Sequence, residues 1–469
     1  MPIRVRIAPS PTGLFHVGTA RTALFNYLFA KKFGGAFIVR IEDTDQERSS
    51  IEYESVIFEA LAWLGFTPDE GPNEGGNFGP YRQSERNERG IYKKELEKLL
   101  HSDGELHAFI CTHPAAGDEN TLLHHCDQLD AREYKHGGII RLHVPDLKEP
   151  IIVQDKVRGQ VQFLMSDVGD FSIAKDLDTP LYNFAATVDD HAMQITDVIR
   201  GEDHLANTPK QMLLNRTLGY TDPNFYHLPL LLGPDRSKLS KRHGATSVAE
   251  FKAAGYLPEA LVNYLALLGW NPGTEQEIFS PAELMAAFSI EKVHKSGAIF
   301  DRSKLDWLNG EYIRQMPVGE LTARLLPFLK NLPLGAVSQE KLEAIVALEQ
   351  PRLKKLSEIG ERVRFYFEPP RVAFDLLQWK GMTEDEVISS LEASIEILNN
   401  LLSQKKDQRT DIERALLNAA AKMGDRGKLL WPLRAALSGA PASPGPFDIV
   451  ELLGIPESIE RLRRVKNGI

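Results

Sequence analysis

Apolar residues in the first hundred positions alternate between the spacing typical of strands and the spacing typical of helices. IRVRIA (3–8) and AFIVRIED (36–43) predict strands, and between them apolar positions recur at helical spacing from residue 20 to residue 28. Helices rich in Glu and Leu are expected near 51–65 and 84–101. A strand, a helix and a second strand in this order predict a parallel β-α-β unit with a right-handed crossover, as in a doubly wound sheet.

The pattern changes twice further along the chain. Between residues 101 and 180, short apolar runs separated by turn residues predict a mostly β insertion. Alternating strands and helices return at about residue 181, and helical spacing dominates from about residue 248 onward. The sequence therefore predicts an interrupted α/β domain followed by a helical half.

Composition narrows the class of protein without identifying it. The chain has 469 residues, of which 42% are hydrophobic and 26% charged, and it lacks an apolar run of the roughly 18 residues that cross a bilayer. We therefore expect a soluble globular protein of two or three domains with no membrane segment. Because it has only two cysteines, Cys111 and Cys126, and no visible secretory signal, we expect it in the reducing cytoplasm.

The charge of the chain gives a mixed signal about nucleic acids. A formal net charge of -10 is unfavourable for a nucleic-acid binder, since phosphate contacts need Lys and Arg. Only the contacting face has to be basic, however, and basic runs occur at 352–356 and 461–466. Such runs are usually solvated helix faces. The composition leaves RNA binding open.

The turn after the first strand, APSPTGLFHVGTART (8–22), contains two prolines, two glycines and one histidine. A turn of this kind presents backbone N–H groups and the positive end of a helix dipole, which together suit a phosphate. Gly18 has no Cβ, so a ligand could lie close to the backbone there, and His16 could donate to a phosphate oxygen. A tight turn with a surface histidine explains the stretch equally well, since isolated glycine patterns are weak signals.

A basic loop, GPDRSKLSKRHG (233–244), follows a later apolar strand. Lys238 and Lys241, with Ser240 between them, could clamp a triphosphate and neutralise the charge that develops as pyrophosphate leaves. A solvated basic loop is the simpler alternative. The turn and the loop together indicate a nucleotide site more specifically than either does alone.

Several strings in these regions resemble a known family. HVGT (16–19) and KLSKR (238–242) resemble the two signature motifs of class I aminoacyl-tRNA synthetases, in their usual order. RIAPSPTG, FIVRIEDTD, YRQSER, TDVIRGEDH and KLSKRHGATSV, together with PLRAALSG (432–439), resemble the bacterial-type glutamyl-tRNA synthetases. The resemblance covers residues 3–439, close to the whole chain.

The resemblance implies a multidomain α/β plus all-α fold, built on the Rossmann-like catalytic domain of class I synthetases. A domain that binds the acceptor end of tRNA is inserted into the catalytic domain, and helical stem-contact and anticodon-binding domains follow it. The expected bounds are 1–100 and 181–235 for the two catalytic halves, 101–180 for the insertion, 236–314 for the signature loop and stem-contact domain, and 315–469 for the anticodon-binding domain.

The same resemblance implies the activity and its participants. L-Glutamate would be activated by ATP to glutamyl-adenylate with release of pyrophosphate, and the glutamyl group would pass to the 3′ terminal adenosine of tRNA(Glu). Mg²⁺ would accompany ATP, and the chain would be a monomer. The family also implies that tRNA is bound before glutamate is activated.

The family's functional residues fall on matching positions of this chain. Those expected to bind ATP are Gly13, His16, Gly18, Thr19, Lys238, Ser240 and Lys241, of which His16, Lys238 and Lys241 take part in catalysis. Those expected to bind glutamate are Arg6, Ser10, Glu42, Tyr182 and Arg200. The planar guanidinium fork suits a carboxylate, and buried arginines disfavour glutamine, whose neutral amide leaves a positive charge uncompensated.

Local sequence alone supports other interpretations of the acidic residues. Glu42 and its neighbours could be an acidic loop that makes Asx turns, and Asp203 and His204 could be a helix N-cap pair. The family pattern places Asp203 and His204 beside the pocket.

The insertion raises the question of zinc. Some family members carry a zinc site that opens with Cys-x-Cys, but Phe109 occupies the place of the first cysteine here. Other donors in the segment could form a mixed tetrahedral site, namely Cys111, His113, His124, His125 and Cys126. Because their spacing is not that of the family, we expect no zinc and no other resident metal.

The stretch FDRSKLDWLNGEYIR (300–314) resembles the junction between the catalytic and tRNA-reading parts. Trp307 within it is expected in the core rather than as a base-stacking platform, since it lies on an amphipathic helix.

Alternative functions from neighbouring classes remain at this point. One is a non-discriminating form that also glutamylates tRNA(Gln). The others are a tRNA-modifying paralogue that also activates glutamate and a non-enzymatic RNA-binding relative. The helical residues after Arg314 argue against the modifying paralogue, and the intact phosphate motifs argue against a non-enzymatic protein.

Overall fold

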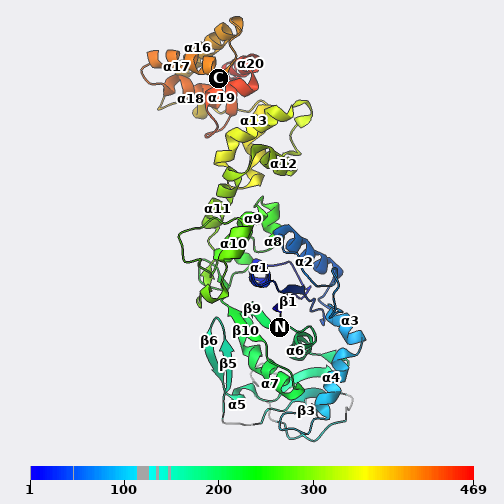
Figure 1. The fold of residues 1–469 in the computed structure, drawn as a ribbon. Helices are drawn as coiled ribbons and strands as arrows, with labels where there is room; N and C mark the ends of the chain where they lie inside the picture. The colour runs from blue at the N-terminus through cyan, green and yellow to red at the C-terminus, as the bar shows by residue number, and fades with distance from the viewer. Residues whose placement is uncertain (1, 46, 114–125, 134–136, 146–148) are drawn as a thin grey trace. The chain divides into compact units, whose positions relative to one another are not determined.

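The computed structural model describes residues 2–45, 47–113, 126–133, 137–145 and 149–469. The chain forms two compact units (Figure 1). The first unit comprises Met1–Ala253 and Leu257–Leu305, and the second comprises Ala254–Tyr256 and Asp306–Ile469. Among the described residues, none of the helices has the length and apolarity that a bilayer crossing requires.

A six-stranded sheet organises the first unit, in the order β2-β1-β9-β10-β5-β6. The neighbours from β2 to β5 run parallel, whereas β6 runs antiparallel to β5. Helix α1 connects β1 to the parallel strand β2 and packs against both, which confirms the predicted β-α-β unit. The strands of the sheet are β1 (Arg4–Ile7), β2 (Ala36–Val39), β5 (Ile151–Asp155), β6 (Gly159–Phe163), β9 (Asp197–Gly201) and β10 (Asn224–Leu228).

Two smaller sheets accompany the main one. Strands β3, β4, β7 and β8 form an antiparallel sheet in that order, and β11 pairs with β12 in parallel. Their bounds are β3 (Ala108–Cys111), β4 (Ile139–Leu142), β7 (Phe171–Asp176), β8 (Thr179–Pro180), β11 (Leu231–Leu232) and β12 (Ala298–Ile299).

The β5–β6 hairpin differs from the expectation for the insertion. Residues 101–180 were expected to form one inserted domain, but β5 pairs with β10 and so extends the main sheet. The short apolar runs of this segment reveal that strands form, but they carry no information about which strand each one pairs with.

Helices surround the sheets of the first unit. They are α1 (Val17–Lys32), α2 (Ile51–Leu64), α3 (Gln83–Glu88), α4 (Ile91–Leu100), α5 (Met165–Val168), α6 (Tyr182–Ala192), α7 (Thr208–Leu218), α8 (Val248–Ala253), α9 (Pro258–Leu267) and α10 (Pro281–Ala287). Two 3₁₀ turns matter for the site, η1 (Glu202–Asn207) and η2 (Lys241–His243).

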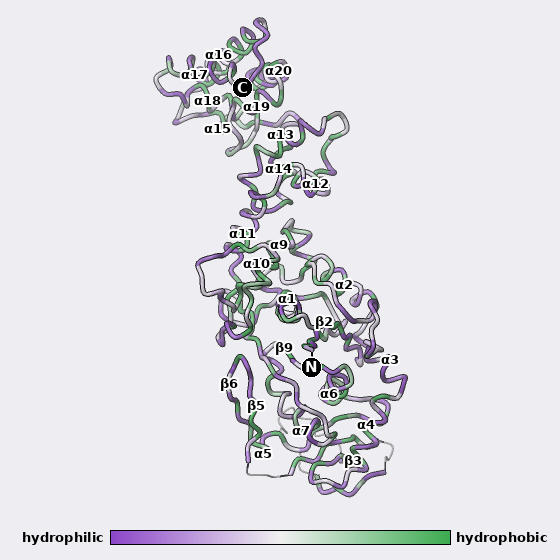
Figure 2. Tube along the Cα trace, viewed as in Figure 1, coloured by the Kyte–Doolittle hydropathy of each residue, from purple (hydrophilic) through white to green (hydrophobic). Residues whose placement is uncertain are grey.

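The second unit is helical, and residues 306–469, all of which the structure describes, contain no strand. Figure 2 shows apolar and polar residues alternating along its helices, as expected for amphipathic helices around a shared core. The helices are α12 (Val318–Leu329), α13 (Gln339–Glu349), α14 (Ile359–Phe367), α15 (Phe374–Leu377), α16 (Glu384–Ser403), α17 (Arg409–Lys422), α18 (Gly427–Ser438), α19 (Pro446–Leu453) and α20 (Ile455–Lys466).

Helix α11 (Arg302–Gln315) contains the boundary between the units, which falls between Leu305 and Asp306. The prediction that Trp307 is a core residue is wrong, because its side chain is 41% exposed. The buried side of the helix carries Leu308 and Ile313, and Trp307 lies one helical step of about 100° away from Leu308.

Candidate active site

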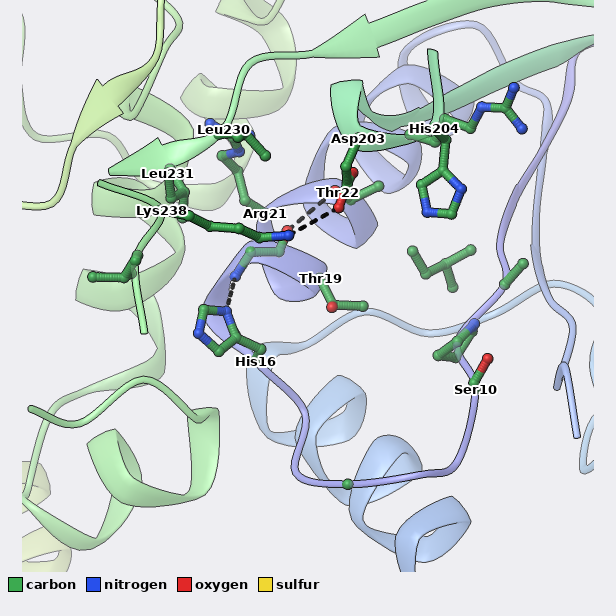
Figure 3. Close-up of a pocket in the computed structure, with 18 of the residues that line it drawn as sticks. Ser10, His16, Thr19, Arg21, Thr22, Asp203, His204, Leu230, Leu231 and Lys238 are labelled. Atoms are coloured by element: carbon green, nitrogen blue, oxygen red, sulfur yellow. Dashed lines mark hydrogen bonds and ion pairs between the residues drawn. The ribbon is translucent and has the colours of Figure 1, made fainter. Parts of the chain in front are cut away.

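A pocket of about 860 Å³ opens at the carboxyl ends of β1 and β9, where ligands bind in open α/β sheets. Its walls come from β1 and the following turn, the start of α1, η1 and the loop before α8 (Figure 3). All twelve residues predicted for ATP and glutamate line it, namely Arg6, Ser10, Gly13, His16, Gly18, Thr19, Glu42, Tyr182, Arg200, Lys238, Ser240 and Lys241.

The proline-rich turn is tied to the chain that follows β2. Proline has no N–H to donate, but the carbonyl oxygens of Pro9 and Pro11 accept backbone hydrogen bonds of 3.1 Å from Glu42 and Ser50. These bonds fix the turn against the acidic end of the neighbouring strand. The turn therefore holds Ser10 and Glu42 in the same wall of the pocket.

His16 is the N-cap of α1, and its Nδ1 accepts a hydrogen bond of 3.1 Å from the Gly18 amide. In the neutral ring this contact places the proton on Nε2, which can donate. Burial, and secondarily the charge of Lys238, lowers the pKa of His16, so that the ring is neutral near pH 7.

The structure changes the interpretation of Gly18. Its amide is engaged by His16 and is not available to a phosphate. A Cβ at this position would lie 3.3 Å from Nδ1 of His16, so the absence of a side chain first serves the histidine cap.

Backbone hydrogen bonds join the start of α1 to the segment that follows the second signature motif, although more than two hundred residues separate the two. Val17 donates to the carbonyl of Thr246 at 2.9 Å, and Val248 donates to the carbonyl of Phe15 at 3.0 Å. The segment after the basic loop is therefore fixed to the start of α1, which brings Lys238 and Lys241 to the same pocket as His16.

Side chains of the basic loop divide into two groups. Lys238 and Lys241 line the pocket, and Nζ of Lys238 lies 3.1 Å from Oδ2 of Asp203 (Figure 3). Arg242 and His243 instead pair with Asp235 inside the loop. The loop is thus partly held by its own charges, and its two lysines are the ones that face a ligand.

Arg200 is a buried cation with neutral partners. It is 5% exposed and donates to Nε2 of His227, to Oε1 of Gln211 and to Oγ1 of Thr208, at 3.1, 2.9 and 2.9 Å. Among the described residues no acidic group pairs with it. A buried charge without a counterion is costly, so this position favours an anionic ligand.

A buried histidine holds Arg200 in place. Burial lowers the pKa of His227, whose Nδ1 lies 2.6 Å from Oδ2 of Asp155. Nδ1 therefore donates to Asp155, and Nε2 accepts from Arg200.

The other two charged residues of this end carry partners of their own. Arg6 binds Asp190 through Nε and Nη2, and Glu42 accepts from Arg40 at 3.1 Å. Burial raises the pKa of Glu42, and Arg40 and Arg6 partly offset that rise. Glu42 thus supplies a carboxylate suited to an ammonium group, opposite in charge to Arg200.

Tyr182 and His204 lie together beside this end of the pocket. The Tyr182 hydroxyl lies 3.0 Å from Nδ1 of His204, and burial together with Arg200 lowers the pKa of His204 to about 4. Asp203, on the same 3₁₀ turn, faces Lys238 instead. Both predicted residues of this pair therefore border the pocket, as expected.

Sequence reasoning missed other residues of the site. Arg21, Thr22, Asn207, Thr246 and Ser247 also line the pocket. Behind it, Asp190 on α6 contacts both Arg6 and Arg40. The string VDDH was a signal for this acid, because two adjacent carboxylates following an apolar helical run are expected to be buried only when paired.

The zinc question concerns a cluster that lies outside the pocket. Sγ of Cys111 and Sγ of Cys126 each lie 3.5 Å from Nδ1 of His113, and the three ligand atoms lie within 4.8 Å of one another. His124 and His125 fall outside the described residues. The expectation that no zinc is bound stays a prediction, and the metal content of the purified protein tests it.

Comparisons with known proteins identify the family of the chain. The catalytic domain of class I tRNA synthetases for glutamate and glutamine matches residues 2–307, and an anticodon binding domain matches residues 320–466. Glutamate–tRNA ligases from Elusimicrobium minutum and Carboxydothermus hydrogenoformans are 41% and 42% identical to the chain. The first match covers 98% of both chains, and the second covers 99% of this chain and 100% of the relative.

Solved structures give the same answer. The crystal structure of a glutamate tRNA ligase from Elizabethkingia meningosepticum, in complex with its amino acid, superposes with a TM-score of 0.85 at 32% identity over 100% of this chain and 99% of that one. Glutamate-tRNA synthetase from Elizabethkingia anophelis superposes with a TM-score of 0.83 at 31% identity over 100% of both chains. With full-length relatives, a matching catalytic domain and a helical anticodon domain, the chain belongs to the glutamate–tRNA ligases of the class I aminoacyl-tRNA synthetases.

Proposed function

We propose that the pocket binds L-glutamate at its Arg200 end and ATP with its Mg²⁺ at its His16 end. The α-carboxylate of glutamate attacks the α-phosphate in line, forming glutamyl-adenylate and releasing pyrophosphate. A ribose hydroxyl of the terminal adenosine of tRNA(Glu) then attacks the acyl carbon and AMP leaves. The observation that carries the proposal is the buried guanidinium of Arg200 without an acidic partner among the described residues.

At the glutamate end, opposite charges orient the substrate. The side-chain carboxylate pairs with Arg200, assisted by Arg6 and the Tyr182 hydroxyl, and the ammonium group pairs with Glu42. Ser10, on the turn between β1 and α1, also lines this end of the pocket. Glutamine would leave Arg200 uncompensated, and this difference disfavours it.

At the ATP end, the positive side chains act on the phosphates. Nε2 of His16 donates to a phosphate oxygen, and Gly13 and Thr19 border the same space. Lys238 exchanges Asp203 for the triphosphate, and Lys241 neutralises charge on the departing pyrophosphate. Glu42 is engaged by Arg40, and Mg²⁺ enters on the phosphates as part of the substrate.

The chain's remaining partner is tRNA(Glu). We infer that the segment 101–180 binds its acceptor end, 236–314 its stem and 315–469 its anticodon. A cavity of about 390 Å³ in the second unit supports the last assignment, because phosphate and base contacts need cationic side chains. Its basic residues are Arg352, Arg362, Arg364 and Arg371, of which the first three form ion pairs with Glu349, Glu358 or Glu368. We also propose that the protein acts as a cytoplasmic monomer.

The glutamate end is tested by Arg200→Leu. Because it removes the charge that holds the substrate carboxylate, we expect the KM for glutamate in pyrophosphate exchange with tRNA(Glu) present to rise about 100-fold, equivalent to roughly 3 kcal/mol. The KM for ATP should stay within a factor of two. Arg4→Gln is the control, since Arg4 lies on the same strand as Arg6, pairs with Glu70 and does not line the pocket. An unchanged KM for glutamate in a folded Arg200→Leu protein would contradict the proposal.

The ATP end is tested by Lys241→Ala. If Lys241 acts on the leaving pyrophosphate, its loss lowers the rate of adenylate formation by at least about 100-fold and changes the Kd of ATP by only a few-fold. Single-turnover kinetics and equilibrium ATP binding measure the two quantities separately. Equal losses in rate and in binding would sink the assignment. Arg242→Ala, on the same 3₁₀ turn but paired with Asp235, is the matched control.

A further inference from the structure

We propose that Asp190 is a positioning residue that fixes both ends of the glutamate site at once. It does not touch the substrate in this scheme. It acts through Arg6 on the carboxylate end and through Arg40 and Glu42 on the ammonium end. The inference rests on the proposed function of Arg200 and Glu42 and adds a residue that neither the signature motifs nor the expected site contains.

Asp190 contacts two arginines, Arg6 on β1 and Arg40 directly after β2. Its Oδ1 accepts from Nε of Arg6 at 3.0 Å and from Nη1 of Arg40 at 2.6 Å, and its Oδ2 accepts from Nη2 of Arg6 at 3.2 Å. The contact with Arg6 is therefore bidentate, which fixes the plane of the guanidinium. Of the three guanidinium nitrogens of Arg6, only Nη1 has no hydrogen-bond partner within the described part of the chain.

Arg40 carries the same constraint to the ammonium end. Its Nη2 donates to Oε1 of Glu42 at 3.1 Å, while its Nη1 is held by Asp190. Arg40 is fully buried, so it has no freedom to hold Glu42 in another position. The Asp190 carboxylate thus orients Arg6, which donates to the substrate carboxylate. Through Arg40 it also orients Glu42, which accepts from the substrate ammonium group.

The register of the sheet explains why one residue can reach both ends. Strands β1 and β2 pair in parallel with Arg6 opposite Ile38. Because side chains alternate between faces with a period of two, Arg6, Arg40 and Glu42 belong to the same face. Helix α6 brings Asp190 to that face and carries Tyr182, another residue of the pocket wall, at its first position.

The balance of buried charge supports a role beyond packing. Burial alone would raise the pKa of Asp190, but Arg6 and Arg40 lower it to about 2, so the carboxylate is ionised throughout the physiological range. Arg6 and Arg40 are compensated by Asp190 and Glu42, whereas Arg200 is not. Asp190 therefore neutralises Arg6 and leaves Arg200 as the position that lacks an anion.

The test compares Asp190→Asn with a buried aspartate that does not face the site. We expect Asp190→Asn to raise the KM for glutamate at least tenfold in pyrophosphate exchange and to leave the KM for ATP within a factor of two. Asp197→Asn is the control, because Asp197 is also buried at the sheet but its hydrogen-bond partners, Thr196, Asn224 and Tyr226, do not line the pocket. A folded Asp190→Asn enzyme with a normal KM for glutamate, or with equal losses for both substrates, would overturn the inference.

A substrate fragment separates the two ends. Glutarate has both carboxylates of glutamate and no ammonium group, so as a competitive inhibitor it reports the carboxylate end. Asp190→Asn should weaken glutarate inhibition along with glutamate binding, whereas Arg40→Met should raise the KM for glutamate at least tenfold and change the Ki of glutarate less than threefold. If Arg40→Met weakens the binding of glutamate and of glutarate equally, the assignment of Arg40 to the ammonium end is wrong.

Two further variants keep the outcome interpretable. If Asp190→Asn fails to fold, Asp190→Glu retains the negative charge with a longer side chain, and a normal KM for glutamate in that variant would overturn the inference. Arg200→Leu distinguishes a failure of the glutamate site from a failure of the role of Asp190. A normal KM for glutamate in Arg200→Leu would contradict the proposed glutamate site itself. A raised KM for glutamate in Arg200→Leu, together with a normal KM for glutamate in Asp190→Asn, would contradict only the role of Asp190.

Discussion

Single side chains in this pocket combine structural and chemical roles, and His16 is the clearest case. Its Nδ1 caps α1 through Gly18, while its Nε2 is left to donate to a phosphate. A helix N-terminus that is capped by a neutral acceptor can attract a phosphate without placing a competing negative charge there. The same ring therefore stabilises the helix and contributes to the ATP site.

The two roles of His16 can be separated by substitution. Asparagine is a good N-cap but has no imidazole, whereas alanine provides neither group. We expect both His16→Asn and His16→Ala to lower the rate of adenylate formation about 100-fold, because both lack Nε2. Only His16→Ala should lose stability, by about 1 kcal/mol, in urea unfolding. If His16→Asn keeps the wild-type rate of adenylate formation, the donor role of Nε2 is wrong.

Residues that line the pocket were predictable because they belong to strings with a recognisable order, and those behind the pocket were not. Asp155, Asp190 and His227 hold Arg200 or Arg6 through contacts between residues that are more than 25 positions apart. Such pairing depends on which strands are neighbours, and a single sequence does not specify that. Gly18 was predicted at the right place for an incomplete reason, since its close neighbour is the histidine ring.

At the scale of elements, the turn between β1 and α1 organises the site. Pro9 and Pro11 restrict φ, and their carbonyl oxygens accept from the backbone of Glu42 and Ser50. The turn is thereby held at both ends, by the segment after β2 and by the segment after the basic loop. This arrangement keeps the glutamate wall and the ATP wall at a fixed separation.

The stiffness of the turn leads to a prediction for a Pro9→Ala and Pro11→Ala double variant. Alanine frees φ but keeps both carbonyl oxygens, so the fold persists and the turn samples more conformations before substrate binds. We expect kcat/KM for glutamate activation to fall about tenfold, with a smaller change in ATP binding. Pyrophosphate exchange measures this effect, and an unchanged glutamate activation in the double variant would refute the role of the prolines.

Helices and strands with a strong periodic pattern of apolar residues were predictable from the sequence. The pairing of the strands and the exposure of single side chains were harder to predict. The β-α-β unit and the helical second half follow from local spacing, and both are present. The β5–β6 hairpin joins the main sheet because β5 lies beside β10, a contact between distant segments that local pattern does not encode. Trp307 shows the same limit for burial, since an amphipathic helix tolerates a large aromatic residue outside its apolar face.

At the scale of the whole molecule, a chain with a negative net charge can bind an RNA substrate because only the residues that contact the RNA need to be basic. Of the two basic runs, 461–466 is partly structural, because Arg461 is buried and donates to the carbonyl of Phe365. Arg352 of the other run lines the cavity in the second unit. Net charge therefore says little about the substrate, and the placement of a few arginines says more.

We expect tRNA binding and glutamate activation to depend on each other. Binding free energy from tRNA contacts accelerates the chemistry only if it favours the reactive arrangement of the pocket. In the structure, Lys238 is paired with Asp203. We therefore expect bound tRNA to stabilise a state in which this pair is broken and Lys238 can bind the triphosphate. We expect pyrophosphate exchange to be at least about 100-fold slower without tRNA(Glu) than with it.

Two controls make this prediction specific. Periodate-oxidised tRNA(Glu), which cannot accept an acyl group, separates an effect on activation from an effect on transfer, and we expect it to support exchange. Asp203→Asn removes the carboxylate that holds Lys238, so it should raise the rate without tRNA while changing the rate with tRNA less. Because the Lys238–Asp203 pair is half-exposed, its free energy is small, and the gain without tRNA should be only a few-fold. Rapid exchange by the wild-type enzyme without tRNA would contradict the dependence itself, whereas an inert Asp203→Asn variant would contradict only the part assigned to Lys238.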